Sequence, residues 1–454
     1  MTRKIGLLDI ILRNDGLILV LLAVPMLFPR PEWTPFFLIL PLLWFLHWRR
    51  SGSPFPVTPL NIPLLLLSFM LLVSLWATFS IEFSLAKISG LLFSLAVFFV
   101  VVRFSERHFE RALAVFLAGG VAIALLGIFG TAWPMKIAAL GALGERIPLW
   151  IQGLPAAESG IHPNELGGVL TLFLPLVIIA LLRGQIKALP GSWLGKVLLL
   201  FIALLLGGVM LLTQSRSAFI GLAFGLALLL TGGGRWGRIL LLVLCLAAVI
   251  AVSQIGVPTL LGLNETETVS PVGEITFASR FEIWSRALYG LQDFSFTGMG
   301  MGTFRRVAPV LYPFFMISSD KDVAHAHNIF LQTGLDLGIP GLVAYVALYL
   351  SSFTMLSWIV TNKNIQNTVL GIKAQHIALG LAGGLLAHGV YGLTDAVALG
   401  AKPGFLWWWL LGLIAALYRL QQTADSRQRT GDMKNSGELL VNSHQLSEKL
   451  TTEG

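Results

Sequence analysis

The sequence is poor in charged residues. Only 12% of its 454 residues are Asp, Glu, Lys or Arg, whereas 56% are hydrophobic and the mean hydropathy is +0.80. A soluble domain carries about 25% charged residues, so too few polar side chains remain here to cover a water-soluble globule. Apolar runs of about 20 residues, the length that spans a bilayer, recur along the chain. They are continuous rather than alternating, which favours membrane helices over a transmembrane barrel.

Other absences narrow the function. A single cysteine, Cys245, excludes an internal disulfide. The chain has no HExxH, paired CxxC, GxSxG or P-loop sequence, so we expect neither a metal nor a cofactor. Gly298, Gly300 and Gly302 follow no strand, and we interpret them as a turn and hinge rather than a dinucleotide fingerprint. The basic residues are spread over many short loops, which argues against nucleic-acid binding despite the net charge of +8.

The apolar runs predict an all-α integral membrane protein of about twelve transmembrane helices. With a cytoplasmic N-terminus, every inside loop carries at least two Lys or Arg residues, as the positive-inside rule requires. We therefore expect a multi-pass protein of the plasma (inner) membrane with both termini in the cytoplasm. The predicted spans are 16–29, 33–48, 60–79, 85–103, 110–132, 164–183, 196–213, 216–231, 238–257, 338–361, 373–394 and 403–420.

Two regions differ from the spans and their short connections. The outer loop 258–337 is far longer than an ordinary connection, and long loops are usually functional or disordered. Its segment SRFEIWSRALYGLQDF, 279–294, has apolar residues at helical spacing, which predicts an amphipathic helix on the outer membrane surface or over a cavity. Residues 1–420 thus form one membrane domain. The polar tail 421–454 is predicted to be a disordered cytoplasmic extension.

Arginines at the outer ends of spans are the first candidates for a site. Arg216 stands between two spans with almost no loop around it. It either reaches outer headgroups or, beside the start of a helix, binds an anion such as phosphate. Arg280 begins the amphipathic helix and is either a solvated loop charge or a second such cation. Arg305 and Arg306 are further outer cations, which we expect at lipid headgroups or on the surface.

Histidines are the candidate proton acceptors. His325 and His327 precede the span at 338–361, and each either caps a helix or takes a proton from a hydroxyl. His162 and Glu165 flank Asn164, which resembles a helix N-cap, so capping is the favoured role there, with substrate contact as the alternative.

The last candidates follow the eleventh span. His388 and Asp395 are seven residues apart, a spacing that would place them on one helix face as a polar pair. Taken together, outer-face arginines and a histidine suit group transfer from a diphosphate-linked donor. The cations would stabilise the leaving diphosphate, and a neutral imidazole would activate an acceptor hydroxyl.

One stretch resembles a known family. His327-Asn328, nine further residues and Gly338-Ile339-Pro340-Gly341 fit the H-[NSQ]-x9-G-x-x-G signature of the O-antigen ligase and polymerase superfamily. The Ser215-Arg216 pair and the large outer loop are also similar to that family. The similarity extends over about residues 60–420.

This resemblance implies an all-helical membrane glycosyltransferase of the GT-C type. Such an enzyme moves a saccharide from undecaprenyl diphosphate to a glycan, lipid or protein acceptor at the periplasmic or outer face. By the resemblance, Arg216 and Arg280 bind the diphosphate and His327 deprotonates the acceptor, in an inverting reaction without metal. His325 and Asn328 would support this site, and Gly338 and Gly341 would let the chain bend into the tenth span.

Two alternatives stay open. A polymerase of the same superfamily would add repeats of a glycan instead of one block. A transporter of lipid-linked glycans would instead show polar residues in mid-span and interrupted helices in two halves of a repeat. The polar residues gather at the outer ends of the spans, which favours the enzyme.

Overall fold

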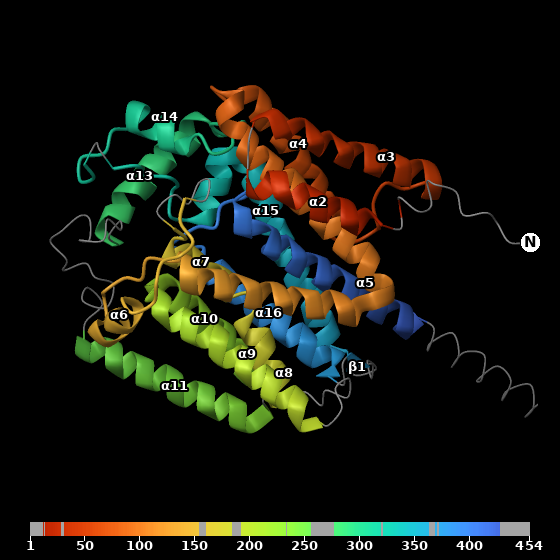
Figure 1. The fold of residues 1–454 in the computed structure, drawn as a ribbon, viewed down its shortest axis with the longest axis vertical. Helices are drawn as coiled ribbons and strands as arrows, with labels where there is room; N and C mark the ends of the chain where they lie inside the picture. Colours follow the sequence, from red (N-terminus) through yellow and green to blue (C-terminus); the bar gives the residue numbers. More distant parts are fainter. Residues whose placement is uncertain are drawn as a thin grey trace, which may run out of the picture.

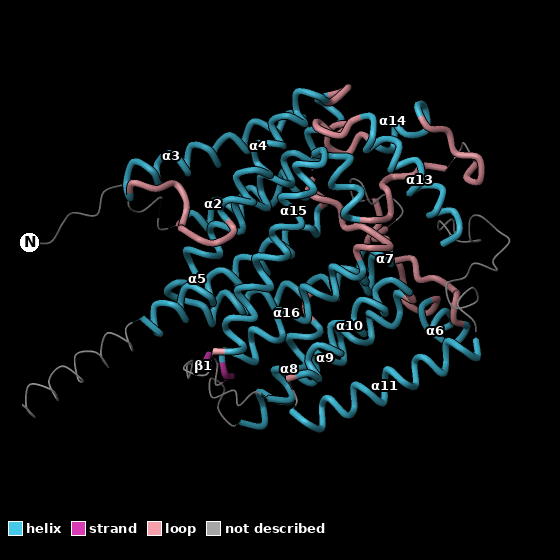
Figure 2. The backbone as a smooth tube through the Cα atoms, turned by 180° about the vertical axis from the view of Figure 1, so that it is seen from behind, coloured by secondary structure: helices cyan, strands magenta, loops and turns pink. Residues whose placement is uncertain are grey.

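The computed structural model describes residues 12, 14–28, 31–153, 160–183, 192–232, 234–255, 277–318, 321–362, 368–369 and 372–426. Helices make up most of this part of the chain (Figures 1 and 2), together with one short antiparallel strand pair, β1–β2. The elements are α2 Asp15–Leu27, η1 Pro31–Leu38, α3 Ile39–Ser51, α4 Asn61–Ala77, α5 Ile81–Gly130, α6 Ala138–Gly144, α7 Pro163–Leu170, α8 Leu174–Arg183, α9 Ser192–Thr213, α10 Arg216–Thr231, α11 Gly234–Ile255, α13 Phe277–Asp293, α14 Phe304–Leu311, α15 Ile329–Thr361, β1 Thr368–Val369, β2 Ile372–Lys373, α16 Ala374–Tyr391 and η2 Lys402–Gly404.

The chain is a multi-pass membrane protein. Among the described residues, 5 helices are long and apolar enough to cross a bilayer, and shorter apolar helices accompany them. Helical structure also covers most of each predicted span range, whereas the number of twelve membrane crossings remains a prediction. The long candidates are Ile81–Gly130, Pro163–Arg183, Trp193–Thr213, Ile329–Thr361 and Lys402–Ser426; the shorter ones are Asp15–Leu27, Asn61–Ala77 and Arg216–Thr231.

Three helix boundaries differ from the sequence prediction. The ranges 85–103 and 110–132 lie on one helix, α5, which bends at His108 (φ −138°, ψ 45°). Their connection contains neither proline nor glycine, so nothing in it ends the helix. Helix α15 begins at Ile329, well before the predicted start at 338. The last helix continues to Ser426, and residues 427–454 of the predicted tail lie outside the described residues.

Close packing of α10 against α16 fixes one side of the site. A Cβ on Gly221 of α10 would lie 2.3 Å from the Ala387 carbonyl oxygen of α16, so only glycine permits this approach. Small residues at helix contacts are typical of membrane proteins. The contact holds the start of α10 beside the loop that follows Tyr391, the last residue of α16.

A smaller apolar core belongs to the outer loop. Helix α13 buries Ile283 and Ala287, while its Phe281 and Leu288 are exposed, so the predicted helix is present; its place on the membrane surface stays a prediction. Figure 1 shows α13 and α14 at one end of the bundle and β1 near the opposite end.

A glycine turn connects α13 to α14 and contacts α15, where Met299 N donates to the Leu335 carbonyl oxygen (2.6 Å). Gly298, Gly300 and Gly302 all have positive φ, which confirms the predicted turn. At the contact, Gly338 leaves the helical conformation within α15 (φ 70°, ψ 177°), and a Cβ there would lie 2.0 Å from the Phe296 carbonyl oxygen. The predicted bend at Gly338 is thus present, and both its backbone conformation and this close approach require glycine.

Candidate active site

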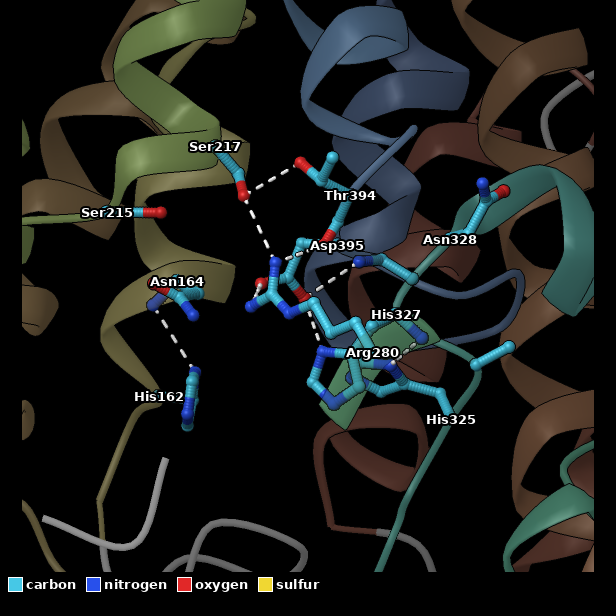
Figure 3. A network of polar contacts seen from close by, with 12 residues as sticks. His162, Asn164, Ser215, Ser217, Arg280, His325, His327, Asn328, Thr394 and Asp395 are labelled. Atoms are coloured by element: carbon cyan, nitrogen blue, oxygen red, sulfur yellow. Dashed lines mark hydrogen bonds and ion pairs between the residues drawn. The ribbon is translucent and has the colours of Figure 1, made fainter. Parts of the chain in front are cut away.

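The site is centred on the buried carboxylate of Asp395, in the loop after α16 (Figure 3). Its Oδ2 lies 3.2 Å from Nη2 of Arg280, which donates a hydrogen bond to it. Its Oδ1 lies 3.3 Å from Nδ1 of His327. One carboxylate therefore connects the predicted diphosphate ligand with the predicted base.

Arg280 is held from three directions. It lies in the first turn of α13, and its Nη1 donates to Ser217 Oγ (3.4 Å) and to the Thr394 carbonyl oxygen. The hydroxyls of Thr394 and Ser217 are themselves 2.8 Å apart. This network ties α13, the first turn of α10 and the loop of Asp395 into one unit, which fixes the guanidinium in place.

His327 adopts an uncommon backbone conformation. Its φ of 45° lies in the left-handed region, which is strained for a residue with a side chain. The following residue, Asn328, caps α15 by accepting hydrogen bonds from Phe330 N (2.9 Å) and Leu331 N (3.0 Å). Its amide also donates to the Leu393 carbonyl oxygen (3.0 Å), so the histidine loop is fastened to the loop of Asp395.

Further hydrogen bonds hold the backbone on both sides of His327. Trp284 of α13 donates its indole N–H to the His327 carbonyl oxygen (3.4 Å). His325 Nδ1 accepts from His327 N (3.1 Å), and the two rings lie with centroids 4.3 Å apart. Gln332 accepts from Ala326 N (2.9 Å) and donates to Asp336. The strained residue is thus held by groups from α13 and α15.

The charge states follow from these surroundings. Burial lowers the pKa of His327 below its ordinary value, although the Asp395 carboxylate opposes this shift. Burial, and then the neighbouring His327, lower the pKa of His325 further. Burial alone would raise the pKa of Asp395, but the Arg280 guanidinium and the contact with His327 hold it well below its usual range. At neutral pH the site therefore combines neutral imidazoles with an Arg–Asp ion pair.

The ring nitrogens of His327 consequently have different roles. Because Nδ1 faces the Asp395 carboxylate, the tautomer with its proton on Nδ1 is favoured, which leaves the Nε2 lone pair able to accept a proton. A carboxylate that orients an imidazole in this way is a recurrent arrangement in general-base catalysis.

Arg216 begins α10 and is exposed. The side chain of Ser215 caps this helix by accepting from Ala218 N (3.4 Å), and Ser217 contacts Arg280. The first turn of α10 therefore carries Arg216 and contacts Arg280 through Ser217. Because free N–H groups and the positive end of the helix dipole face outward from such a turn, this region suits an anion.

A metal ion has one candidate position among the described residues. His325, His327 and Asp395 each offer a ligand atom, all within 4.8 Å of one another. Arg280 shares the same carboxylate, so its positive charge opposes a cation there. This charge arrangement fits an anionic substrate better than a divalent cation.

Two predicted contacts are corrected by the structure. His388 does not pair with Asp395, because α16 ends at Tyr391 and the seven-residue helical spacing no longer applies. His388 instead contacts the Tyr349 hydroxyl (2.9 Å). The N-cap of α7 is His162 rather than Asn164: Pro163 occupies the first helical position, and His162 Nδ1 accepts from Asn164 N (3.3 Å).

The remaining predicted residues make no hydrogen bond or ion pair with Asp395, Arg280 or His327 among the described residues. Glu165 is half-buried in the first turn of α7. Arg305 forms an exposed ion pair with Asp322. Gly341 follows the bend in α15, where a Cβ would lie 2.3 Å from Leu337 Cβ.

The sequence reasoning missed Ser217, Thr394 and Trp284 as contacts of the site. Ser217 follows Arg216 directly, so its place near the helix start was one signal for it. No sequence pattern predicts that the Thr394 carbonyl contacts Arg280 or that the Trp284 indole contacts His327.

The comparisons with known proteins match a region that contains several residues of the candidate site. The family model described as O-antigen ligase matches residues 199–346, a range that contains Arg216, Arg280 and His327. Residues 199–346 are thus similar to the O-antigen ligase family. An O-antigen ligase of Pseudomonas aeruginosa is 29% identical to this chain over 228 residues. That alignment covers 49% of this chain and 48% of the relative, so the chain spans about half the length of the curated relative that it matches.

Proposed function

We propose that this chain transfers a saccharide from an undecaprenyl diphosphate carrier to an acceptor hydroxyl at the periplasmic or outer face of the membrane. The similarity to O-antigen ligases supports glycan transfer in the membrane. The reaction details rest on the arrangement around Asp395, which carries the proposal.

In the proposed reaction, His327 Nε2 takes the proton of the acceptor hydroxyl. The acceptor oxygen bonds to the anomeric carbon while the bond from that carbon to the diphosphate oxygen breaks. The electron pair leaves with undecaprenyl diphosphate, whose developing charge is stabilised by Arg280, Arg216 and the start of α10. One direct displacement inverts the anomeric configuration.

The single observation behind these roles is the shared carboxylate. Asp395 lies 3.3 Å from His327 Nδ1 and 3.2 Å from Arg280 Nη2. It can therefore orient the base and fix the guanidinium at the same time. Pre-positioned charges of this kind stabilise a transition state without reorganisation during the reaction.

The test is glycan transfer by the purified chain in proteoliposomes that contain a labelled undecaprenyl-diphosphate-linked glycan and a candidate acceptor. We expect transfer that is lost in His327→Ala and Arg216→Ala. Full activity of both variants would overturn the assigned roles. The product distinguishes a ligase, which adds one block to a foreign acceptor, from a polymerase, which gives a ladder of repeats.

Metal removal provides a second test of the chemistry. Because Arg280 already neutralises Asp395, we expect EDTA dialysis to leave the transfer rate within about twofold of the untreated protein. A loss that Mg²⁺ or Mn²⁺ restores would show that a metal ion takes part.

A further inference from the structure

Lys87 and Glu165 have opposite charges and lie next to the candidate site, but the proposed reaction gives neither of them a role. Lys87 lies in the second turn of α5, and Glu165 lies in the first turn of α7. Both are half-exposed. Lys87 interacts electrostatically with His325, and Glu165 interacts with Asp395 and His162. Contacts give the same location: Gly302, which a Lys87 side-chain carbon approaches, donates to Asp336 beside the histidine loop, and Gly167 of α7 lies against Ala218 in the first turn of α10.

Lys87 is turned into the protein rather than toward lipid headgroups. A Cβ on Gly302 would lie 3.0 Å from its Cγ, which places the side chain against the glycine turn. Its ammonium also interacts with Glu165 and Asp336. A lysine near a span end usually extends to the membrane surface, and one that faces the interior instead is a candidate for function.

Lys87 and Glu165 interact electrostatically without direct contact. In the described part of the chain, neither the ammonium of Lys87 nor the carboxylate of Glu165 has a hydrogen bond or an ion pair within 4.0 Å. Each group therefore keeps its full hydrogen-bonding capacity for a ligand. A partly buried charge without a partner loses part of its hydration, which makes a bound polar partner favourable.

The charges indicate what kind of ligand fits. Lys87 interacts electrostatically with two carboxylates, Glu165 and Asp336, and with one further cation, Arg305, so there is no excess of positive charge here to attract a phosphate. The diphosphate is better placed at Arg216 and Arg280. A sugar hydroxyl suits this pair, because it donates to a carboxylate and accepts from an ammonium, and such charge-assisted hydrogen bonds are strong.

We propose that Lys87 and Glu165 form a saccharide subsite that binds hydroxyl groups of the sugar next to the reacting bond. This inference rests on the proposed glycan transfer and adds the residues that recognise the glycan. The sugar belongs either to the donor or to the acceptor, and the experiment has one arm for each source.

The donor arm compares two lipids bound to the full chain in nanodiscs: undecaprenyl diphosphate carrying N-acetylglucosamine, and sugar-free undecaprenyl diphosphate. The acceptor arm measures binding of a lipopolysaccharide core oligosaccharide. Both arms use the wild type, Lys87→Met, Glu165→Gln and the double variant. The control Lys321→Met removes an exposed lysine of the outer loop. Thermal unfolding in detergent monitors folding.

We expect each single variant to weaken binding of the sugar-bearing ligand in one arm by about 10-fold. Affinity for sugar-free undecaprenyl diphosphate should stay within about twofold in all variants. The double variant should bind at least as weakly as either single variant. The arm that changes identifies the sugar as the donor's or the acceptor's.

Three results would overturn the subsite. Unchanged binding in both arms would show no sugar contact. An equal loss for sugar-free undecaprenyl diphosphate would make Lys87 an anion ligand. Recovery of wild-type binding in the double variant would mean that the two charges only balance each other. Because these arms measure binding, failure of the proposed transfer is seen separately, as wild-type protein that binds sugar but forms no product.

Discussion

Two arginines of the 258–337 loop form Arg–Asp pairs that have the same chemistry and different surroundings. Arg280 and Asp395 are almost fully buried, with side chains 8% and 2% exposed. Arg305 and Asp322 form the second pair, with side chains 37% and 60% exposed. The buried carboxylate also faces His327, whereas the exposed pair lies at the surface of the outer loop.

This difference decides which pair matters for function. An exposed ion pair contributes about 0–1 kcal/mol, because water and salt screen it. Removing one partner of a buried pair costs about 3–5 kcal/mol, since the other charge remains buried and uncompensated. Burial also preserves the influence of Arg280 and Asp395 on the neighbouring imidazole. The sequence alone does not show which of the two Arg–Asp pairs is buried. Only the packing of the folded chain shows this.

The largest expected effect comes from replacing His327, whose imidazole contacts Asp395 of the buried pair. His327→Gln keeps a polar side chain but removes the proton acceptor. We expect kcat for glycan transfer to fall about 10³-fold, measured as initial rates in proteoliposomes. The matched control is His47→Gln in α3. His47 also contacts a carboxylate, that of Asp15 (3.3 Å), but it is not part of the candidate site, so this variant should retain wild-type rates. Equal losses in both variants would contradict the role of His327.

Replacing each arginine by lysine compares the two pairs directly. Arg280→Lys keeps the charge but loses the forked contacts with Asp395, Ser217 and Thr394. We expect kcat/KM to fall about 10²-fold. Arg305→Lys should remain within about twofold of the wild type. The comparison fails if the Arg305 variant loses as much activity as the Arg280 variant.

The pH dependence tests the coupling of Asp395 to His327. Burial lowers the pKa of His327, so kcat/KM of the wild type should rise with pH through a midpoint below about 6.5, the ordinary value of histidine. The Asp395 carboxylate raises this pKa, so Asp395→Asn should move the midpoint to lower pH while it reduces the maximal rate. An unchanged midpoint, or one at higher pH, would separate Asp395 from the base.

A smaller effect should follow from the bend that places the histidine loop relative to the glycine turn. Gly338→Ala forces a Cβ into the Phe296 carbonyl at positive φ, and we expect a loss of about 1–3 kcal/mol in the free energy of unfolding. Gly207→Ala in α9, where a Cβ meets nothing within 4 Å, is the control and should not destabilise. Thermal unfolding in detergent measures both. Equal stability of the two variants would contradict the need for glycine at 338.

The sequence was sufficient to locate the helices, because long apolar runs have few alternatives in a bilayer. It did not show that α5 continues through 104–109, since that connection is polar yet composed of residues that a helix accepts. The start of α15 was also missed. The helix begins with the polar cap Asn328, whereas the prediction looked for the first strongly apolar turn.

The sequence was enough to predict Arg280 and His327 as site residues, but not their contacts with Asp395. Arg280 and His327 stand out as polar residues at span ends. The partner of Asp395 could not be read from spacing, because Gly392 follows the last helical residue of α16 and the loop then turns toward α13. The left-handed conformation of His327 has no sequence signature, since it is imposed by contacts from Trp284 and Gln332.

The most direct measurement compares Asp395→Asn with Asp322→Asn in the same proteoliposome assay. Each variant removes one carboxylate charge from an Arg–Asp pair of the outer region and keeps the size of the side chain. If the buried carboxylate orients the base and fixes Arg280, kcat/KM should fall about 10²-fold or more in Asp395→Asn and stay within about twofold in Asp322→Asn. Similar rates in the two variants would contradict the central role of Asp395.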